Sequence, residues 1–198
     1  MIYNYLRRND IVNTSTIVII VIAGILVLLA FYVIGVYNRL VNAKNKVANQ
    51  FSQVDIQLKR RADLIPNLVE TVKGYAKHEE GTLTAVIEAR NKAVSATSIN
   101  EKVEANNQLT GALNKLFALS EAYPELKANE NFLSLQKDLK ETEDKITYAR
   151  QFYNDSAMGY NNLVEMFPSN IVANMFKFKN FEYFKIDEKE KEVPKVKF

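Results

Sequence analysis

The sequence contains no cysteine and a single histidine. The absence of cysteine excludes disulfide bonds, thiol catalysis, cysteine-ligated metals and lipoprotein processing. The one histidine, His78, has no second histidine near it, so neither a zinc site nor a Ser–His–Asp triad is supported. The six glycines never form the spacing of a phosphate-binding loop. We therefore expect no catalytic activity, no cofactor and no metal.

The net charge of +3 is too small to indicate a nucleic-acid partner. Basic residues are concentrated locally, because six of them lie between residues 38 and 61 against one acid, Asp55. This bias suits a helix that leaves an anionic membrane surface, and it is equally typical of a solvated helix face. The six basic residues are Arg39, Lys44, Lys46, Lys59, Arg60 and Arg61.

One long hydrophobic run stands out, from Ile17 to Tyr37, with no charged side chain. A bilayer core of about 30 Å needs roughly 20 helical residues to cross it. The run is too long for the apolar part of a signal peptide, and no small-x-small cleavage site follows it. Aromatic residues near its end, Tyr32 and Tyr37 among them, suit the membrane interface. We predict an uncleaved transmembrane helix at 17–37, after a short tail at 1–16.

The sequence after this run has the periodicity of helices and never that of strands. A first soluble helix continues out of the bilayer with heptad spacing, and Pro66 is expected to kink it. Its main apolar series includes Phe51, Leu58 and Ile65. A flanking series recurs every seven residues, with Arg61 as the one interruption. The main series comprises Tyr37, Val41, Ala48, Phe51, Leu58, Ala62, Ile65, Val69, Val72 and Ala76, and the flanking series Leu40, Val47, Val54, Leu68 and Tyr75.

Three further helices are predicted, over 82–96, 100–122 and 132–167, with Pro124 and Pro168 ending the last two. Leu83, Val86, Ile87, Arg90 and Val94 are assigned to the inner face of the first of them. Short loops between long amphipathic helices favour an antiparallel bundle. The predicted fold is therefore all-α: an N-terminal transmembrane helix continuing into a long antiparallel bundle at 38–185. Residues 186–198 are highly charged, and we expect them to be disordered.

Charged residues interrupt the apolar stripes of the long helices. Asp55 and Arg61 do so on the first soluble helix, and Glu143 and Arg150 lie beside the stripe of the last one. A buried charge needs a partner, and such pairs can fix the register of a bundle. A ligand or proton site between the helices is the functional alternative.

An aromatic stretch at residues 176–184 lies beyond the last long helix. It is too apolar to remain in water, and exposed apolar surface of this kind marks binding sites for protein or membrane. It is therefore a candidate interaction surface. The alternative is that it folds back over the end of the bundle. Its aromatic residues are Phe176, Phe178, Phe181, Tyr183 and Phe184.

Several ordered motifs resemble the LemA family. The longest, residues 55–70, reads DIQLKRRADLIPNLVE, and the others are 37–41 (YNRLV), 123–129 (YPELKAN), 142–146 (TEDKI) with 149–150 (AR), 160–161 (YN) and 167–168 (FP). The resemblance implies a bacterial single-pass membrane protein with a helical bundle and no agreed enzymatic activity, and one branch of the family is similar to proteins of magnetic membrane compartments. The candidate register-setting residues thus become Asp55, Arg60, Arg61, Asp63, Asn67, Glu143 and Arg150.

We predict from these observations a cell-membrane scaffold or interaction protein that forms homo-oligomers, with the lipid bilayer and another membrane protein as further partners. An adaptor subunit for a membrane protease or an envelope-maintenance complex is the alternative. The N-terminal tail carries Arg7 and Arg8 against Asp10, whereas three cations and no acid follow the apolar run closely. The positive-inside rule then favours an outside N-terminus and a cytoplasmic bundle.

Overall fold

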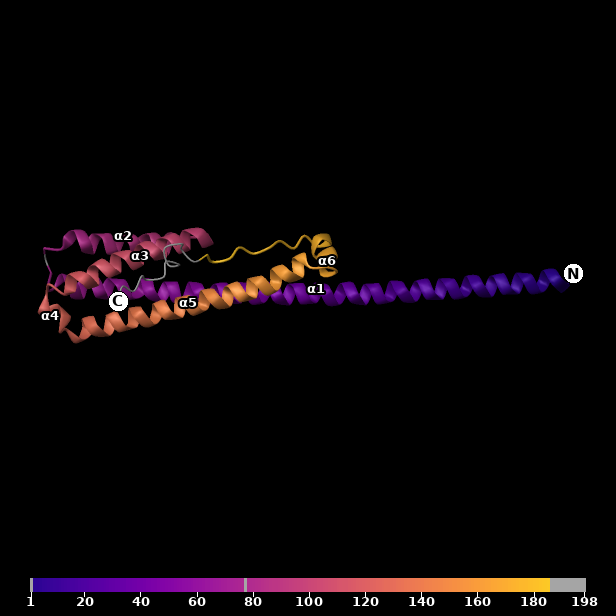
Figure 1. The fold of residues 1–198 in the computed structure, drawn as a ribbon, viewed down its shortest axis with the longest axis horizontal. Coiled ribbons are helices and arrows are strands. Elements are labelled where there is room, and N and C mark those ends of the chain that lie inside the picture. Colours follow the sequence, from indigo (N-terminus) through magenta and orange to yellow (C-terminus); the bar gives the residue numbers. More distant parts are fainter. Residues whose placement is uncertain (1, 77, 186–198) are drawn as a thin grey trace, which may run out of the picture.

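The apolar run and the first soluble helix form one continuous helix. A computed structural model describes residues 2–76 and 78–185, with side chains from residue 14 onward. Helix α1 spans Ile2–Lys73, a length of about 108 Å at 1.5 Å per residue. Its N-terminal half projects alone from the bundle (Figure 1), and every side chain described from 14 to 32 is exposed. Among the described residues, only this helix is long and apolar enough to cross a membrane.

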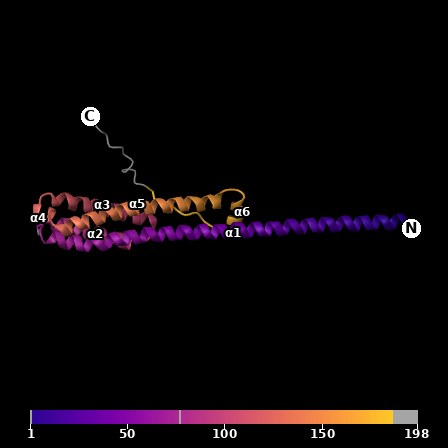
Figure 2. The ribbon, with the colours of Figure 1, turned by 90° about the horizontal axis from the view of Figure 1, so that it is seen from below.

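The remaining helices are packed against the second half of α1. Helix α5 runs back along α1 in the opposite direction, and the hairpin of α2 and α3 covers only the half of the bundle that is distant from the projecting part (Figures 1 and 2). We call this the distal half, and the half next to the projecting part the proximal half. The predicted all-α fold is confirmed. The elements are α2 (Glu80–Ser95), α3 (Ile99–Ser120), α4 (Pro124–Lys127), α5 (Glu130–Glu165) and α6 (Ser169–Met175).

The core consists of two hydrophobic clusters, one in each half. In the distal half α1, α2, α3, α4 and α5 all contribute side chains, and Leu126 of the short α4 closes the end with no exposed surface. In the proximal half α1 and α5 pack together with α6 and the chain that follows it. The second cluster therefore depends on residues that lie after the last bundle helix.

The innermost line of α1 is the series that we expected to flank the stripe. Leu40, Val47 and Val54 have no exposed surface, whereas Ala48 of the expected main series is exposed and Phe51 is partly buried. In the proximal half, α5 is the one long helix beside α1. Only one residue of α1 per heptad is therefore fully buried there. Further along, α2 and α3 add neighbours, and residues of both series are buried as far as Val72, whereas Tyr75 at the end of the flanking series is 40% exposed.

Helix α1 continues through Pro66 to Lys73, and its ribbon shows no break there (Figures 1 and 2). Proline has no N–H, so the carbonyl of Ala62, four residues earlier, loses its helical donor. Arg90 of α2 supplies a replacement, since its Nε donates to the Ala62 oxygen at 3.3 Å. A partner from a second helix therefore satisfies the carbonyl that Pro66 frees.

Local signals set the ends of the shorter helices. Ser98 caps α3 in a capping box with Glu101, and the backbone N–H groups of Thr97 and Ser98 hold the pKa of the Glu101 carboxyl down to about 2. Pro124 was expected only to end a helix. It is instead the first residue of α4, a position where its missing N–H is not needed. On α2, Ala89 is buried. Ile87 and Val94, which the sequence assigned to the inner face, are instead 43% and 58% exposed.

Beyond α5 the chain turns at Pro168, forms α6 and then runs extended along the bundle toward its distal half (Figure 1). The expected disordered tail at 186–198 lies outside the described residues. This return path places the aromatic stretch alongside α1 and α5.

Candidate functional site

Arg61 is the centre of a buried polar network in the middle of the bundle. It lies on the innermost line of α1, between Val54 and Leu68, and is only 3% exposed. Its Nη1 donates to Asn106 Oδ1 at 2.7 Å, and its Nη2 donates to Thr110 Oγ1 at 2.9 Å. Both partners belong to α3. One guanidinium therefore joins two helices through directional contacts.

Glu143 of α5 completes the charge balance of this network. Its Oε2 lies 2.5 Å from Arg61 Nη1, in a geometry that makes the contact an ion pair rather than an aligned hydrogen bond. Burial lowers the pKa of Arg61, the carboxylate of Glu143 raises it and the nearby Arg150 lowers it. An arginine stays protonated in such surroundings, so the buried charge is fixed and needs its partner.

Two more of the predicted polar residues reach the spaces between helices. Asp55 of α1 forms a 2.5 Å ion pair with Lys102 of α3, whose ammonium also lies 4.5 Å from the centroid of the Phe51 ring. Arg150 of α5 places its guanidinium carbon 5.7 Å from the centroid of Phe184. The structure thus gathers Asp55, Arg61, Glu143 and Arg150 along the interfaces of α1, α3, α5 and the aromatic stretch.

The other three predicted register residues lie on the outer surface of α1. Asp63 pairs with Lys59 within the same helix, and both side chains are more than half exposed. Arg60 and Asn67 are exposed as well. The structure therefore does not bring Arg60, Asp63 or Asn67 together with polar groups of another helix.

Sequence reasoning missed the α3 half of the network. Asn106 and Thr110 are spaced by four residues on a helix face that is otherwise apolar, near Val103 and Leu113. Asn106 is 2% exposed. Their spacing could have indicated that both are inward-facing polar residues, but nothing in the sequence indicates that Arg61 is their partner.

The network offers little for chemistry. A cavity of about 370 Å³ adjoins it, lined by Glu143, Arg150 and Asn154 among others, yet the Glu143 carboxylate that could act as a base is held by Arg61. His78 lies at the opposite end of the distal half, in the turn before α2. Within the described residues, no three acidic or histidine side chains gather where they could hold a metal ion. The arrangement suits helix alignment.

The aromatic stretch lies against the bundle in the structure. Phe184 is 4% exposed, and Phe178 and Phe181 are packed on the proximal cluster. Phe184 meets the ring of Tyr153 edge-on at 5.0 Å, and Phe181 meets that of Tyr160 at 5.1 Å. Phe176 and Tyr183 remain 47% and 40% exposed. Most of the apolar surface of the stretch is therefore used within the chain.

Two asparagines of α5 hold the backbone of this stretch. Asn161 accepts from the Phe181 N–H at 2.9 Å and donates to the Phe181 carbonyl at 3.0 Å. Asn154 does the same with Phe184, at 2.9 and 2.8 Å. Seven helical residues rise about 10.5 Å, and three extended residues span about 10 Å. The asparagine spacing on the helix thus matches the residue spacing on the extended chain.

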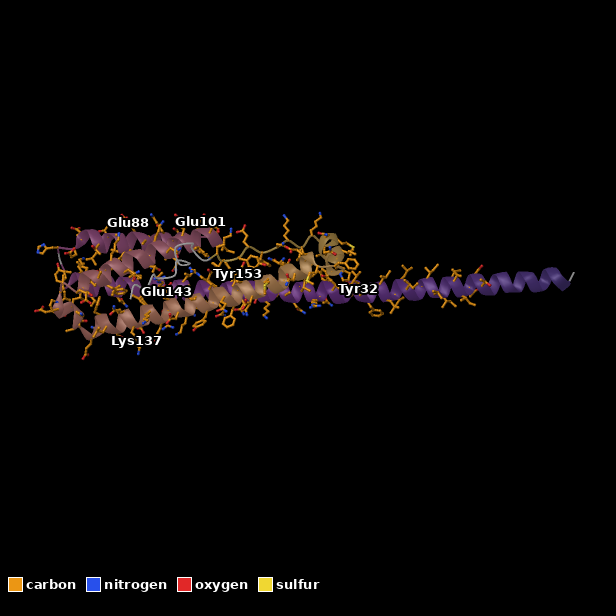
Figure 3. All side chains as sticks on the ribbon, viewed as in Figure 1. Tyr32, Glu88, Glu101, Lys137, Glu143 and Tyr153 are labelled. Carbon is orange, nitrogen blue, oxygen red and sulfur yellow. The ribbon has the colours of Figure 1, made fainter. Side chains whose placement is uncertain are left out.

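The buried Tyr153 adds a third contact between these elements, because its hydroxyl donates to the Glu182 carbonyl at 2.9 Å. Burial raises the pKa of Tyr153, with Glu182 and Tyr183 adding to the effect. Tyr153 is labelled on α5 next to the returning chain (Figure 3). Sequence reasoning did not assign these side chains, although Asn154 and Asn161 share one helix face at a spacing of seven.

Comparison with known proteins finds a LemA family model that matches residues 50–198. A protein named Protein LemA, from Metamycoplasma hominis, is 30% identical over 165 residues, which cover 81% of this chain and 74% of that protein. Two proteins named for the magnetosome are also similar: MamQ 2 of Paramagnetospirillum magneticum and MamQ of Magnetospirillum gryphiswaldense. Each is 25% identical over 75% of this chain, and the match spans 64% of the length of each MamQ protein.

Proposed function

The chain belongs to the LemA family, and from that membership we propose that it is a membrane-anchored helical scaffold that assembles with copies of itself and catalyses no reaction. The exposed apolar part of α1 supports the anchor, because the run has the length of a membrane span and its most apolar 18-residue window has no buried residue. The polar network supports a structural role, because its groups are directed at other helices.

The observation that carries self-assembly is an aromatic pair on the outer face of α5. Tyr148 and Phe152 follow one another by one helical turn and are 61% and 59% exposed, and Met158 beyond them is 52% exposed. The opposite face of α5, with Ile146 and Ala149, packs in the core. Exposed aromatic side chains one turn apart, with an exposed methionine nearby on the same helix, are typical of protein interfaces.

A second copy of this chain is the partner that fits this face. Anchoring through α1 would hold all copies at the same depth in the membrane and in the same orientation. Neighbouring copies would therefore present the same outer face of α5 at the same level. Confinement to a surface also raises the effective concentration, so that weak contacts become populated. Exposed charges of both signs surround the pair and permit contacts between identical surfaces: Lys140, Glu141, Asp144, Lys145 and Asp155.

The test is the mass of full-length protein in mild detergent, measured by light scattering. We expect an oligomer, and we expect the double variant Tyr148→Glu, Phe152→Glu to fall to the protomer mass. Val94→Glu is the matched control, since Val94 is 58% exposed on α2. Circular dichroism melting should show all variants folded.

A protomer mass for the unaltered protein would overturn self-assembly. If that protomer co-purifies with one membrane partner, the adaptor function gains support. If Val94→Glu dissociates the oligomer as well as the aromatic double variant does, the α5 face is not the interface.

The orientation that we propose places the bundle in the cytoplasm. The flank of α1 with Arg39, Lys44 and Lys46 supports it through the positive-inside rule. Lys177 and Lys179 follow α6 directly, and Phe178 between them lies 5.8 Å from Tyr37, measured between ring centroids. The fold therefore adds two cations to the end that faces the lipid head groups, where anionic lipids attract them.

A further inference from the structure

We propose that the α5–α6 turn and α6 form a second membrane-contacting element, which inserts into the interfacial layer of the leaflet from which α1 emerges. This inference rests on the proposed anchoring of α1 and does not depend on self-assembly. The element lies at the end of the bundle next to the projecting part of α1, where several large apolar side chains are exposed.

The position of α6 along α1 is the first argument. Val172 and Ala173 of α6 are buried in the proximal cluster, against which Val33 and Val36 of α1 also pack. Both α1 residues lie inside the apolar run that ends at Tyr37. Figure 3 labels Tyr32 on α1 beside the end of the bundle where α6 lies. If residues 17–37 span the bilayer, α6 is at the depth of the last turns of the span.

The exposed surface of this element is the second argument. Five large apolar side chains between residues 166 and 176 are exposed. Phe167 at the turn is 79% exposed, the highest value among the exposed large hydrophobic residues. Contiguous apolar surface of this kind is characteristic of interaction sites. The five are Met166 (61%), Phe167 (79%), Ile171 (59%), Met175 (58%) and Phe176 (47%).

A cavity between the turn and α1 is the third argument. It measures about 600 Å³ and is lined by Tyr32, Val36, Leu163, Phe167 and Pro168, with Arg39 as its one charged residue. Arg39 has no carboxylate partner among the described residues. The apolar lining would suit the acyl chains of a leaflet. Arg39, which lies nearer the bundle, would suit the phosphate groups at its surface.

The charge around this element is the fourth argument, and it selects lipid over a protein partner. No acidic residue occurs between Asp10 and Asp55, or between Glu165 and Glu182. These two segments supply the α1 exit and the α5–α6 turn. The element therefore has exposed apolar side chains at residues 166–176, cations beside them at Arg39, Lys177 and Lys179, and no carboxylate in either segment. This is the composition of an interfacial membrane anchor.

The element is too small to hold the protein on a membrane without α1. Its effect is on orientation, because a bundle fixed to the bilayer at both α1 and α6 cannot swing about the point where α1 emerges. The projecting helix and the turn together therefore hold the bundle at one angle to the membrane, which is the geometry that lateral contacts between copies require.

Depth-dependent quenching tests the inference on the full-length protein. Because the chain has no cysteine, single substitutions can be labelled with an environment-sensitive fluorophore without background. Phe167→Cys and Ile171→Cys report on the turn and α6. Val94→Cys is the matched control, because Val94 and Ile171 are both β-branched and are 58% and 59% exposed. Val27→Cys reports on the span.

The labelled proteins are reconstituted in vesicles of phosphatidylcholine and phosphatidylglycerol that carry lipids with spin labels at different depths. We expect quenching at 167 and 171 to be several-fold stronger than at 94, with the shallow label more effective than the deep one. At 27 the deep label should be the more effective.

Each other result decides against the inference. Quenching at 167 equal to that at 94, with 27 quenched, would overturn the second contact and leave the anchor intact. A blue-shifted but unquenched probe at 167 would show burial against another copy instead of lipid. No quenching at 27 would overturn the anchor, and the inference with it.

Discussion

At the scale of single residues, the most informative side chain is Arg61. It occupies a position in the innermost line of α1 where the neighbouring heptads carry Val54 and Leu68, both without exposed surface. A charge placed there favours the one alignment in which α3 and α5 present Asn106 and Glu143 to it. Shifting any of the three helices by one turn would leave a buried cation without partners. Specifying a single register in this way is an established use of buried polar groups.

The first prediction follows from this pair. Glu143→Gln removes the carboxylate and leaves the buried Arg61 charge uncompensated, so we expect a loss of about 3 kcal/mol in unfolding free energy. Adding Arg61→Met to that variant removes the charge and should restore part of the loss. Denaturant unfolding of the full-length protein measures both. Lys59→Met, which breaks an exposed pair, should change stability by less than about 1 kcal/mol.

A second prediction concerns Glu101, whose pKa is lowered to about 2 by the backbone N–H groups of Thr97 and Ser98. A carboxyl group whose pKa is lowered in the folded state stabilises that state above its unfolded pKa of about 4.5. This stabilisation is lost as the pH falls through about 2. Glu101→Ala should therefore lower the melting temperature at pH 7, and the difference from the unaltered protein should shrink below about pH 4.5. A difference that is constant with pH would contradict the capping role.

At the scale of elements, contacts from other segments compensate for irregularities in the two long helices. Helix α1 continues through a proline, and Arg90 of α2 donates to the carbonyl that the proline leaves without a helical donor. In the proximal half α5 has only α1 as a long helical neighbour, and the extended aromatic stretch packs beside both, held by Asn154 and Asn161. Both solutions use a side chain with a planar polar group to satisfy backbone atoms.

Arg90 and Pro66 should therefore be energetically coupled. Arg90→Met leaves the buried Ala62 carbonyl without a donor, which we expect to cost about 1–3 kcal/mol. In a Pro66→Ala background residue 66 regains its N–H and can donate to that carbonyl itself, so the same change should cost less. A double-mutant cycle of unfolding free energies measures the difference. Equal costs in both backgrounds would show that Arg90 acts through packing alone.

The asparagine contacts with the aromatic stretch give a matched pair of variants. Asn161→Ala removes both hydrogen bonds to Phe181 and should lower stability by about 2 kcal/mol. Asn162→Ala changes the same residue type one position along, where the side chain is exposed, and should have little effect. Amide hydrogen exchange at residues 181–184 should rise in the first variant only. Similar exchange in both would mean that aromatic packing alone holds the stretch.

At the scale of the whole molecule, the protein is a rod whose two halves have different environments. Residues 2–37 of α1 and residues 38–73 each extend about 54 Å, so with the proposed anchor in the membrane the distal end of the bundle would stand far from the bilayer. Because α1 is continuous from the apolar run into the bundle, the proposed anchor and the bundle share one helix. The proximal aromatic contacts between Tyr37 and Phe176, at 4.7 Å between ring centroids, stiffen the junction.

The orientation prediction belongs to this scale. Trypsin added to intact cells should leave the bundle uncut, and lysis should make it susceptible, because the proposed orientation places it in the cytoplasm. Replacing Arg39, Lys44 and Lys46 by Glu removes the flanking positive charge and should expose a fraction of the bundle on intact cells. Complete digestion of the unaltered protein from outside would reverse the assignment.

Much of this architecture follows from local sequence pattern. The transmembrane run, the helical periodicity, the loop positions near 78 and 97 and the stops at Pro124 and Pro168 depend on neighbouring residues alone. The same holds for Arg61 and Glu143 as candidate register residues, since each lies on or beside an apolar stripe. Arg60, Asp63 and Asn67 share the same motif, but the sequence could not show that they lie on the outer face.

The sequence by itself determined that the chain is helical, roughly where the connections between its long helices lie, and that one helix can span a membrane, because hydrophobic periodicity and length are local properties. Tertiary structure alone decided which stripe of α1 is innermost, since that depends on how many helices surround each half. It also decided the place of the aromatic stretch, because Asn154 and Asn161 bind its backbone, and backbone atoms carry no sequence signal. Contacts between segments distant in sequence are set by three-dimensional packing, and periodicity does not record them.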